Sequence, residues 1–222
     1  MNVLILVGSP KGRSSTSFLL GSKLADGLRN CGAVVTDGMV HRELQSEAGT
    51  TRLLDGVDAA DLVVLAFPLY IDSLPAPLIH LLEIIAERRS RAASPGTPRL
   101  VALVQCGFPE SRQCDTAVAI CRLFALRTGM VWAGALAMGM GGQLAGGIEK
   151  LPGGGKHTLD ALRLAAESLA NGGNIPFEAA TSFGKPLIPR WIYTMFGNLG
   201  WRMQMRKNEV RRPIGFRPFD QA

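Results

Sequence analysis

The stretch "VLILVGSPKGRSST", residues 3–16, decides the fold more than any other part of the chain. It begins with five apolar residues in a row, from Val3 to Val7, a pattern typical of a short strand buried on both faces of a parallel sheet. Two glycines, a proline, two cations and a run of hydroxyl side chains follow at once. This change from apolar to small and polar residues predicts a loop that binds a ligand at the end of the sheet.

The rest of the chain repeats the alternation of strand and helix. Further apolar runs occur at about 33–36, 61–67, 99–105 and 130–137, and helical spacing of apolar residues at about 18–28, 53–60, 75–91, 116–128 and 157–170. Five strands, each followed by a helix, predict an α/β doubly wound fold with a five-stranded parallel sheet. Ligands of such sheets bind beyond the carboxyl ends of the strands, so the loops after strands 1, 3 and 4 form the candidate site.

Composition restricts the class of protein. The chain has 222 residues, of which 47% are hydrophobic and 19% charged, as expected for one globular core with a small appendage. The first apolar run is too short for a signal peptide, and no uncharged apolar stretch reaches the roughly 18 residues of a membrane helix. The four cysteines form no C-x-x-C pair, so we expect no metal site and a reducing, cytoplasmic location.

The first loop has the character of an anion site. A helix that begins near Thr16 directs free N–H groups and the positive end of its dipole at the loop, which favours a phosphate. Lys11 and Arg13 add positive charge, and Gly8 and Gly12 permit close backbone approach. Hydroxyl donors come from Ser9, Ser14, Ser15 and Thr16. The alternative is an ordinary helix N-cap, which needs no ligand.

Two familiar phosphate-binding patterns are absent from the sequence. The loop lacks the G-x-x-x-x-G-K-[ST] spacing of a Walker motif, and Gly8 and Gly12 do not give G-x-G-x-x-G. A second glycine-rich stretch, "GMGGQLAGG" at 139–147, also lacks that spacing, and we interpret it as a mobile loop. The first loop therefore predicts a site for a single phosphate rather than a pyrophosphate.

Three loop sequences together resemble a known family. They are "GSPKGRSST" (8–16), "FPLYIDSLPAPLIHLLE" (67–83) and "CGFPE" (106–110). Over roughly residues 1–170 the chain resembles the flavodoxin-like NAD(P)H-dependent FMN reductases and quinone reductases. The resemblance implies the strand order 2-1-3-4-5, bound FMN, and NADPH or NADH as co-substrate. The chain departs from the family pattern at His80 and Glu83, where relatives often have lysine and aspartate. Any oligomer contact at that helix is therefore left open.

The resemblance also implies which residues bind the cofactor. The first loop would hold the FMN phosphate, the segment after strand 3 would lie along the isoalloxazine, and the loop after strand 4 would border the other edge of the ring. Carried over to this chain, the cofactor-binding residues are Ser9, Lys11, Ser14, Ser15 and Thr16, then Pro68, Leu69, Tyr70 and Ile71, and finally Cys106, Gly107 and Phe108. Backbone N–H groups of the last two loops would stabilise the charge of the reduced flavin.

The function expected from this resemblance is that of an FMN-dependent oxidoreductase. It would take hydride from NAD(P)H and pass electrons to a small acceptor, such as a quinone, a nitro or azo compound, or free flavin. No side chain is expected to be catalytic in its own right, because the flavin carries the chemistry. Two alternatives stay open: a flavodoxin-type electron carrier without NAD(P)H activity, and a flavin-free scaffold that binds through a basic tail.

The positive charge of the chain is concentrated at its C-terminal end. Of 24 Lys and Arg and 18 Asp and Glu, eight basic and two acidic residues lie in 185–222, which leaves 16 of each in 1–184. We expect a flavodoxin-like domain over 1–174 and an extension over 175–222. The extension has an aromatic, uncharged centre from Trp191 to Trp201 with basic flanks that include Arg211 and Arg212. It could pack on the body or in a homo-oligomer, which we favour, or contact a membrane surface; nucleic acid is not an expected partner.

Overall fold

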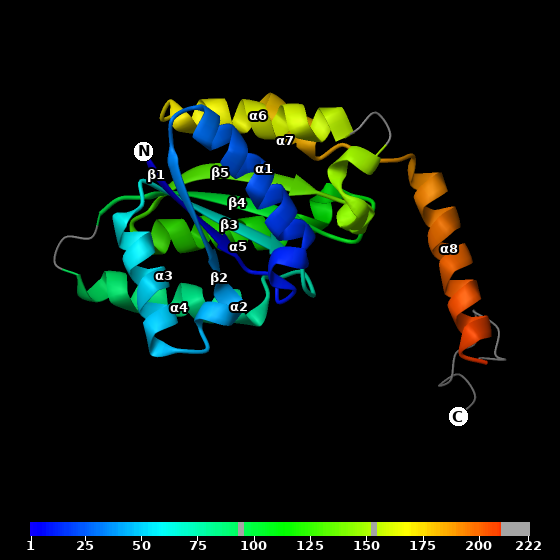
Figure 1. Ribbon diagram of the computed structural model, residues 1–222, viewed down its shortest axis with the longest axis horizontal. Coiled ribbons are helices and arrows are strands. Elements are labelled where there is room, and N and C mark those ends of the chain that lie inside the picture. The colour runs from blue at the N-terminus through cyan, green and yellow to red at the C-terminus, as the bar shows by residue number, and fades with distance from the viewer. Residues whose placement is uncertain (93–95, 152–154, 210–222) are drawn as a thin grey trace. The chain divides into compact units, whose positions relative to one another are not determined.

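The computed structural model describes residues 1–92, 96–151 and 155–209, and it confirms the predicted α/β fold (Figure 1). The chain divides into two compact units, Met1–Leu187 and Ile188–Ala222. The first unit contains a five-stranded parallel sheet in the order β2-β1-β3-β4-β5. Its strands are β1 (Asn2–Val7), β2 (Val34–Met39), β3 (Leu62–Pro68), β4 (Arg99–Gln105) and β5 (Val131–Met138). This is the order that the family resemblance implied.

Helices cover both faces of the sheet. One face carries α1 (Thr16–Asn30), α6 (Lys156–Ala170) and the short α7 (Phe177–Phe183), as Figure 1 shows. The other face carries α2 (Val40–Glu43), α3 (Glu47–Ala59), α4 (Ala76–Arg91) and α5 (Asp115–Thr128). Short 3₁₀ helices occur at η1 (Gly12–Ser14), η2 (Ser111–Cys114), η3 (Gly141–Gly146) and η4 (Ile148–Lys150). Helices α2 and α7 were not expected, because each is too short to show helical periodicity.

The central strands are buried because they are apolar on both sides. Every residue of β1 from Val3 to Val7 and of β3 from Leu62 to Phe67 is buried. The main core lies between these strands and helices α3 to α5, with Leu65, Phe67 and Leu78 among its fully buried side chains. Burying a side chain of this size stabilises the fold by about 1.5–3 kcal/mol.

The register of the sheet brings the candidate loops to one edge. Val7 of β1 pairs with Ala66 of β3, and Pro68 at the end of β3 pairs with Gln105 at the end of β4. Gln105 pairs in turn with Met138 at the end of β5. The loops after these strands therefore leave the sheet side by side.

The edge strand β5 is covered by chain that follows α6. A bulge opposite Leu100 and Val101 twists this strand, and Gly134 adopts a φ of +112° there. Ile175 packs against Gly134, and its N–H donates to the carbonyl of Ala133 at 2.8 Å. Helix α7 then packs on α6 and β5. The compact unit accordingly reaches Leu187, past the boundary at residue 174 that we expected from the sequence.

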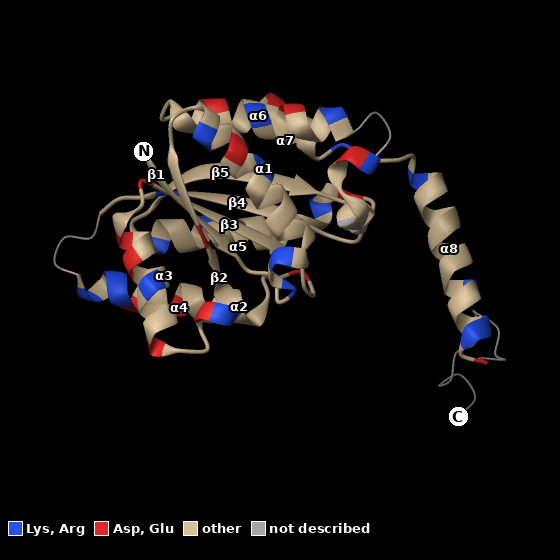
Figure 2. Ribbon diagram, in the orientation of Figure 1, with Lys and Arg blue, Asp and Glu red and all other residues tan. Residues whose placement is uncertain are grey.

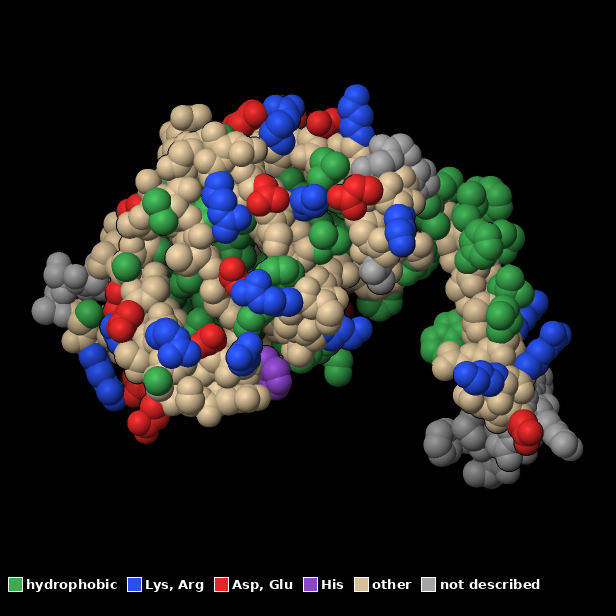
Figure 3. Space-filling model, viewed as in Figure 1, with side chains coloured by type: hydrophobic (Ala, Val, Ile, Leu, Met, Phe, Trp, Pro, Cys, Tyr) green, Lys and Arg blue, Asp and Glu red, His purple; other side chains and the backbone are tan. Residues whose placement is uncertain are grey.

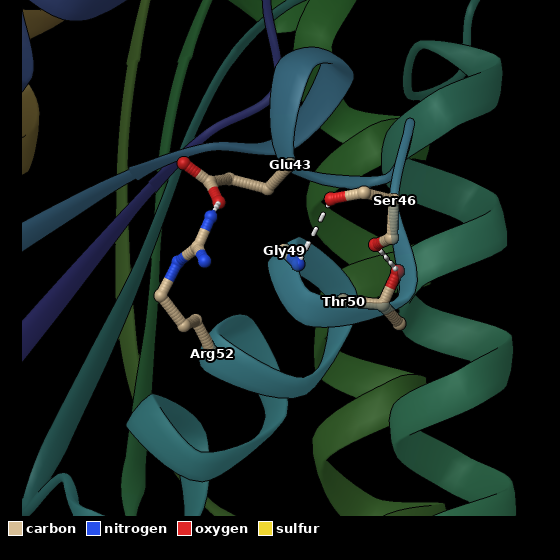
Figure 4. A network of polar contacts seen from close by, with 5 residues as sticks. All are labelled: Glu43, Ser46, Gly49, Thr50 and Arg52. Carbon is tan, nitrogen blue, oxygen red and sulfur yellow. Dashed lines mark hydrogen bonds and ion pairs between the residues drawn. The ribbon is translucent and has the colours of Figure 1, made fainter.

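The junction between α2 and α3 is held by the polar network drawn in Figure 4. The hydroxyl of Ser46 accepts a hydrogen bond from the N–H of Gly49 at 3.1 Å and caps α3. Thr50 donates back to the Ser46 carbonyl, and Arg52 pairs with Glu43 at 2.6 Å. This cap starts α3 at Glu47, earlier than the apolar spacing from residue 53 indicated.

The second unit contains one helix among its described residues, α8 (Arg190–Lys207). The helix carries Arg190, Arg202, Arg206 and Lys207 and no acidic residue within its bounds, as the blue residues of Figure 2 show. Exposed hydrophobic side chains run along it in Figure 3, and they include Trp191, Phe196 and Trp201. Arg211 and Arg212 of the predicted basic flank lie outside the described residues. None of the described helices is both long enough and apolar enough to cross a membrane.

Candidate functional site

A cavity of about 270 Å³ opens where the loops after β1, β3 and β4 meet. This volume is close to the lower end of the range for small-molecule sites, about 300–1,000 Å³. The residues that line it come from the three loops and from the glycine-rich stretch after β5. They are Ser9, Lys11, Ser14, Ser15, Thr16, Pro68, Leu69, Tyr70, Gln105, Cys106, Gly107 and Gly142.

Glycine is required at two positions of the loop after β1. A Cβ atom at Gly8 would lie 2.7 Å from Cδ2 of Leu78, because the loop crosses closely over the start of α4. Gly12 has a φ of +54°, a left-handed conformation in which side chains other than glycine are strained. These two glycines allow the loop to fold back over the N-terminus of α1.

The hydroxyl groups of this loop also make bonds within the protein. Ser15 is the N-cap of α1: its Oγ accepts from the N–H of Phe18 at 3.1 Å and donates to the carbonyl of Gly12 at 2.6 Å. Thr16 Oγ1 donates to the carbonyl of Gly141 at 3.2 Å. Ser14 Oγ donates to the carbonyl of Lys11 at 2.9 Å. The cap that we considered as an alternative to an anion site is therefore present, and it shapes the loop.

The two cations of the loop differ in their surroundings. The guanidinium of Arg13 pairs with Asp37 at 3.0 Å and lies 5.0 Å from the ring centroid of Phe18. Lys11 lines the cavity, and no acidic residue of the described chain lies within ion-pair distance of it. Lys11 is thus the loop cation whose charge is available to an anion in the cavity.

The second wall of the cavity is a tight turn after β3. Tyr70 and Ser73 exchange backbone hydrogen bonds of 2.9 and 3.0 Å, and both residues between them have positive φ, 48° at Ile71 and 57° at Asp72. A β-branched residue such as isoleucine rarely adopts this conformation. The turn directs Ile71 into solvent, where it is 99% exposed, while Pro68, Leu69 and Tyr70 line the cavity.

The third wall is the loop after β4, tied to the glycine-rich stretch after β5. The N–H of Gly141 donates to the carbonyl of Cys106 at 2.8 Å, and that of Met140 to the carbonyl of Phe108 at 2.7 Å. The side chain of Gln105 lies directly over Gly141, where a Cβ atom would clash with its amide. The stretch interpreted as a mobile loop forms η3 from Gly141 to Gly146, and its Gly142 lines the cavity.

The backbone N–H groups of these walls are largely engaged. Leu69 N–H donates to the carbonyl of Gln105, Tyr70 N–H to that of Ser73, and Cys106 N–H to that of Met138. The sheet and the turn use these three N–H groups, so the prediction that loop N–H groups stabilise the charge of a reduced flavin concerns the other residues of the two loops. The side-chain amide of Gln105 is a polar group on the same wall.

The structure brings ten of the twelve predicted site residues around one cavity. The other two, Ile71 and Phe108, do not line it; they are exposed beside Tyr70 and Gly107. Gln105 and Gly142 were missed by the sequence analysis. A polar residue at the end of an apolar strand and a glycine-rich stretch at 139–147 were the available signals. Among the described residues, no cluster of His, Cys, Asp and Glu could hold a metal ion.

Solved structures show the same fold. An NAD(P)H:quinone oxidoreductase from Methanothermobacter marburgensis aligns with a TM-score of 0.53 and 18% identity, over 76% of this chain and 96% of that one. An FMN-dependent NADH-azoreductase from Bacillus anthracis, solved with FMN, aligns with a TM-score of 0.56 and 11% identity, over 77% and 100%. A WrbA-like flavodoxin from Agrobacterium tumefaciens aligns with a TM-score of 0.52 and 15% identity, over 77% and 96%.

The sequence itself places the chain in a family. None of the curated proteins matches it closely enough to count as a relative. The model of the NADPH-dependent FMN reductase family, however, matches residues 1–143, which is well over half of the chain. The matched range includes every residue that lines the cavity. The chain therefore belongs to the family of NADPH-dependent FMN reductases.

Proposed function

We propose that this chain binds FMN in the cavity, takes hydride from NADPH or NADH, and passes electrons to a small acceptor such as a quinone, a nitro or azo compound, or free flavin. One observation carries the proposal. A single cavity joins an anion-type loop at the end of β1 to an apolar wall at the ends of β3 and β4. FMN has this division, with a phosphate at one end and a flat ring system at the other.

The loop after β1 would hold the phosphate. The first N–H groups of α1 have no partner within the helix, and Ser15 takes that of Phe18. The N–H groups of Thr16 and Ser17 would then donate to the phosphate, with the helix dipole behind them. Lys11 would add charge, while Ser15 holds the loop in shape rather than supplying its own proton.

The walls after β3 and β4 would hold the ring. Pro68, Leu69 and Tyr70 offer an apolar surface, and water is excluded where they cover one side of the ring. Gln105 would donate its side-chain amide to the ring edge that becomes negative on reduction, the role that the engaged backbone N–H groups leave open. The bound flavin supplies the hydride and electron chemistry, and these residues supply position and electrostatics.

The acceptor would approach from the open side of the cavity. Tyr70, Ile71 and Phe108 are 45%, 99% and 52% exposed beside it. Apolar and aromatic side chains of this kind favour a flat, apolar acceptor such as a quinone or an azo compound. The experiment is a steady-state assay of NADPH and NADH oxidation by the FMN-loaded protein with a panel of such acceptors. Oxidation at the rate of free FMN would favour the electron-carrier alternative instead.

We also propose a role for the second unit and a location for the protein. The exposed aromatic residues of α8 support docking or homo-oligomerisation as its role. Contact with an anionic membrane surface is the second candidate, favoured by the basic charges of the helix. Four free thiols and the use of NAD(P)H support a cytoplasmic location.

A further inference from the structure

Two thiols lie together behind the wall of the cavity. Cys106 follows β4, lines the cavity and is 2% exposed, while Cys114 ends η2 and is fully buried. Both contact the carbonyl of Met138: Cys106 N–H donates to it at 3.0 Å, and the Cys114 thiol lies 3.9 Å from it. The Cys106 thiol lies 3.8 Å from the carbonyl of Phe108 and 3.7 Å from that of Glu110, and the Cys114 thiol is close enough to act on it through a hydrogen bond.

The environment divides the two thiols into a nucleophile and its partner. The hydrogen bond from Cys114 holds the pKa of the Cys106 thiol below its usual value, against burial, which acts in the opposite direction. The same bond, together with burial, raises the pKa of Cys114. Cys106 lines the cavity and Cys114 lies fully buried behind it, so Cys106 is the thiol that attacks and Cys114 the one that completes a disulfide.

The remaining cysteines have different surroundings. Cys31 is exposed at the end of α1. Cys121 is buried in α5, and burial raises its pKa to about 12. Cys121 is therefore a matched control: a buried thiol close in sequence to Cys114 that keeps its proton.

We propose that Cys106 and Cys114 form a redox-active dithiol that exchanges two electrons with the flavin in the cavity; this rests on the proposed function. In the oxidising direction both S–H bonds break and one S–S bond forms. The thiols lose two electrons and two protons, and the oxidised isoalloxazine takes them up. In the reducing direction, electrons that enter from NAD(P)H pass from the reduced flavin to the disulfide, and both thiols are restored.

The segment between the two cysteines begins with an exposed glycine. Gly107 follows Cys106 directly, and no atom lies within 4 Å of the position that a Cβ would take there. The segment then runs through η2 into α5, and the disulfide would close a ring of residues 106–114. The bond would link the end of β4 to the start of α5 and stiffen one wall of the cavity.

The first arm of the test needs no flavin. The full chain is treated with diamide, with and without FMN, then denatured and alkylated, and disulfides are mapped by mass spectrometry. We expect a Cys106–Cys114 disulfide in the parent and in Cys121→Ala, and none in Cys114→Ala. It should form faster as the pH rises, because the thiolate of Cys106 is the reactive form. Thiols of Cys106 and Cys114 that remain free for alkylation would overturn the proposal.

The second arm measures the electron count. Oxidised, FMN-loaded protein is titrated with NADPH under anaerobic conditions, and free thiols are counted at the end point. About two NADPH per FMN are expected for the parent and Cys121→Ala, and about one for Cys114→Ala, because the disulfide takes a second electron pair. Complete flavin reduction with the disulfide still intact would overturn the proposal. A protein that forms the disulfide but binds no FMN would contradict the proposed function instead.

Discussion

Replacing Lys11 by glutamine removes the loop cation that lines the cavity without an acidic partner among the described residues. If Lys11 contacts the FMN phosphate, the loss is that of one hydrogen bond between charged groups, about 1.5–3 kcal/mol. Because Lys11 is exposed, we use the lower end of this energy range. A loss of about 1.4 kcal/mol corresponds to a factor of ten, so FMN should bind about tenfold more weakly. Riboflavin, which lacks the phosphate, should bind both proteins equally well.

Arg13→Gln is the matched control for this substitution. Arg13 lies in the same loop but is paired with Asp37 and stacked on Phe18, so its loss should change FMN affinity by less than about threefold. Apoprotein is titrated with FMN and with riboflavin, and binding is followed by flavin fluorescence at two salt concentrations. The phosphate assignment is refuted if Lys11→Gln weakens FMN and riboflavin alike, or if Arg13→Gln has the larger effect on FMN.

Three further substitutions or deletions test other parts of the structure. Gly49→Ala places a Cβ within van der Waals overlap of the Glu43 carbonyl, which should lower stability by about 2–3 kcal/mol in thermal unfolding and leave the FMN dissociation constant unchanged. Gln105→Leu should keep FMN but lower its two-electron reduction potential by about 30–60 mV, equivalent to 1.5–3 kcal/mol, in redox-dye titration; an unchanged potential would remove Gln105 from the ring edge. Deleting residues 188–222 should reduce the oligomer mass seen by light scattering and leave FMN bound, whereas an unchanged mass with lost binding to anionic liposomes would favour the membrane role.

The fold was predictable because the apolar composition of its strands shows that they are buried. The apolar runs at Val3–Val7 and Leu62–Phe67 are buried on both faces, so they identify a parallel sheet without any long-range information. Segments that are placed by tertiary contacts gave weaker signals in the sequence. Helix α7 has only seven residues, and the bond from Ile175 to Ala133 depends on a bulge that no local pattern reveals.

The candidate site was predictable at the level of loops but not of individual roles. The loops after β1, β3 and β4 meet because the parallel register aligns their starting points. Whether a hydroxyl faces the cavity or caps a helix depends on three-dimensional geometry, so Ser15 could not be assigned in advance. Gln105 ends β4 and Gly142 lies in η3 after β5, and a linear motif search does not pair them.

The central claim is that NAD(P)H reduces a flavin bound in this cavity. The most direct measurement is a stopped-flow experiment in which FMN-loaded protein is mixed with NADPH or NADH without oxygen, and flavin absorbance is followed. We predict that the oxidised flavin band is lost rapidly and completely, in a single turnover and faster than for free FMN under the same conditions. A tightly bound flavin whose absorbance is unchanged by both nucleotides, or is lost only at the rate of free FMN, would contradict the account.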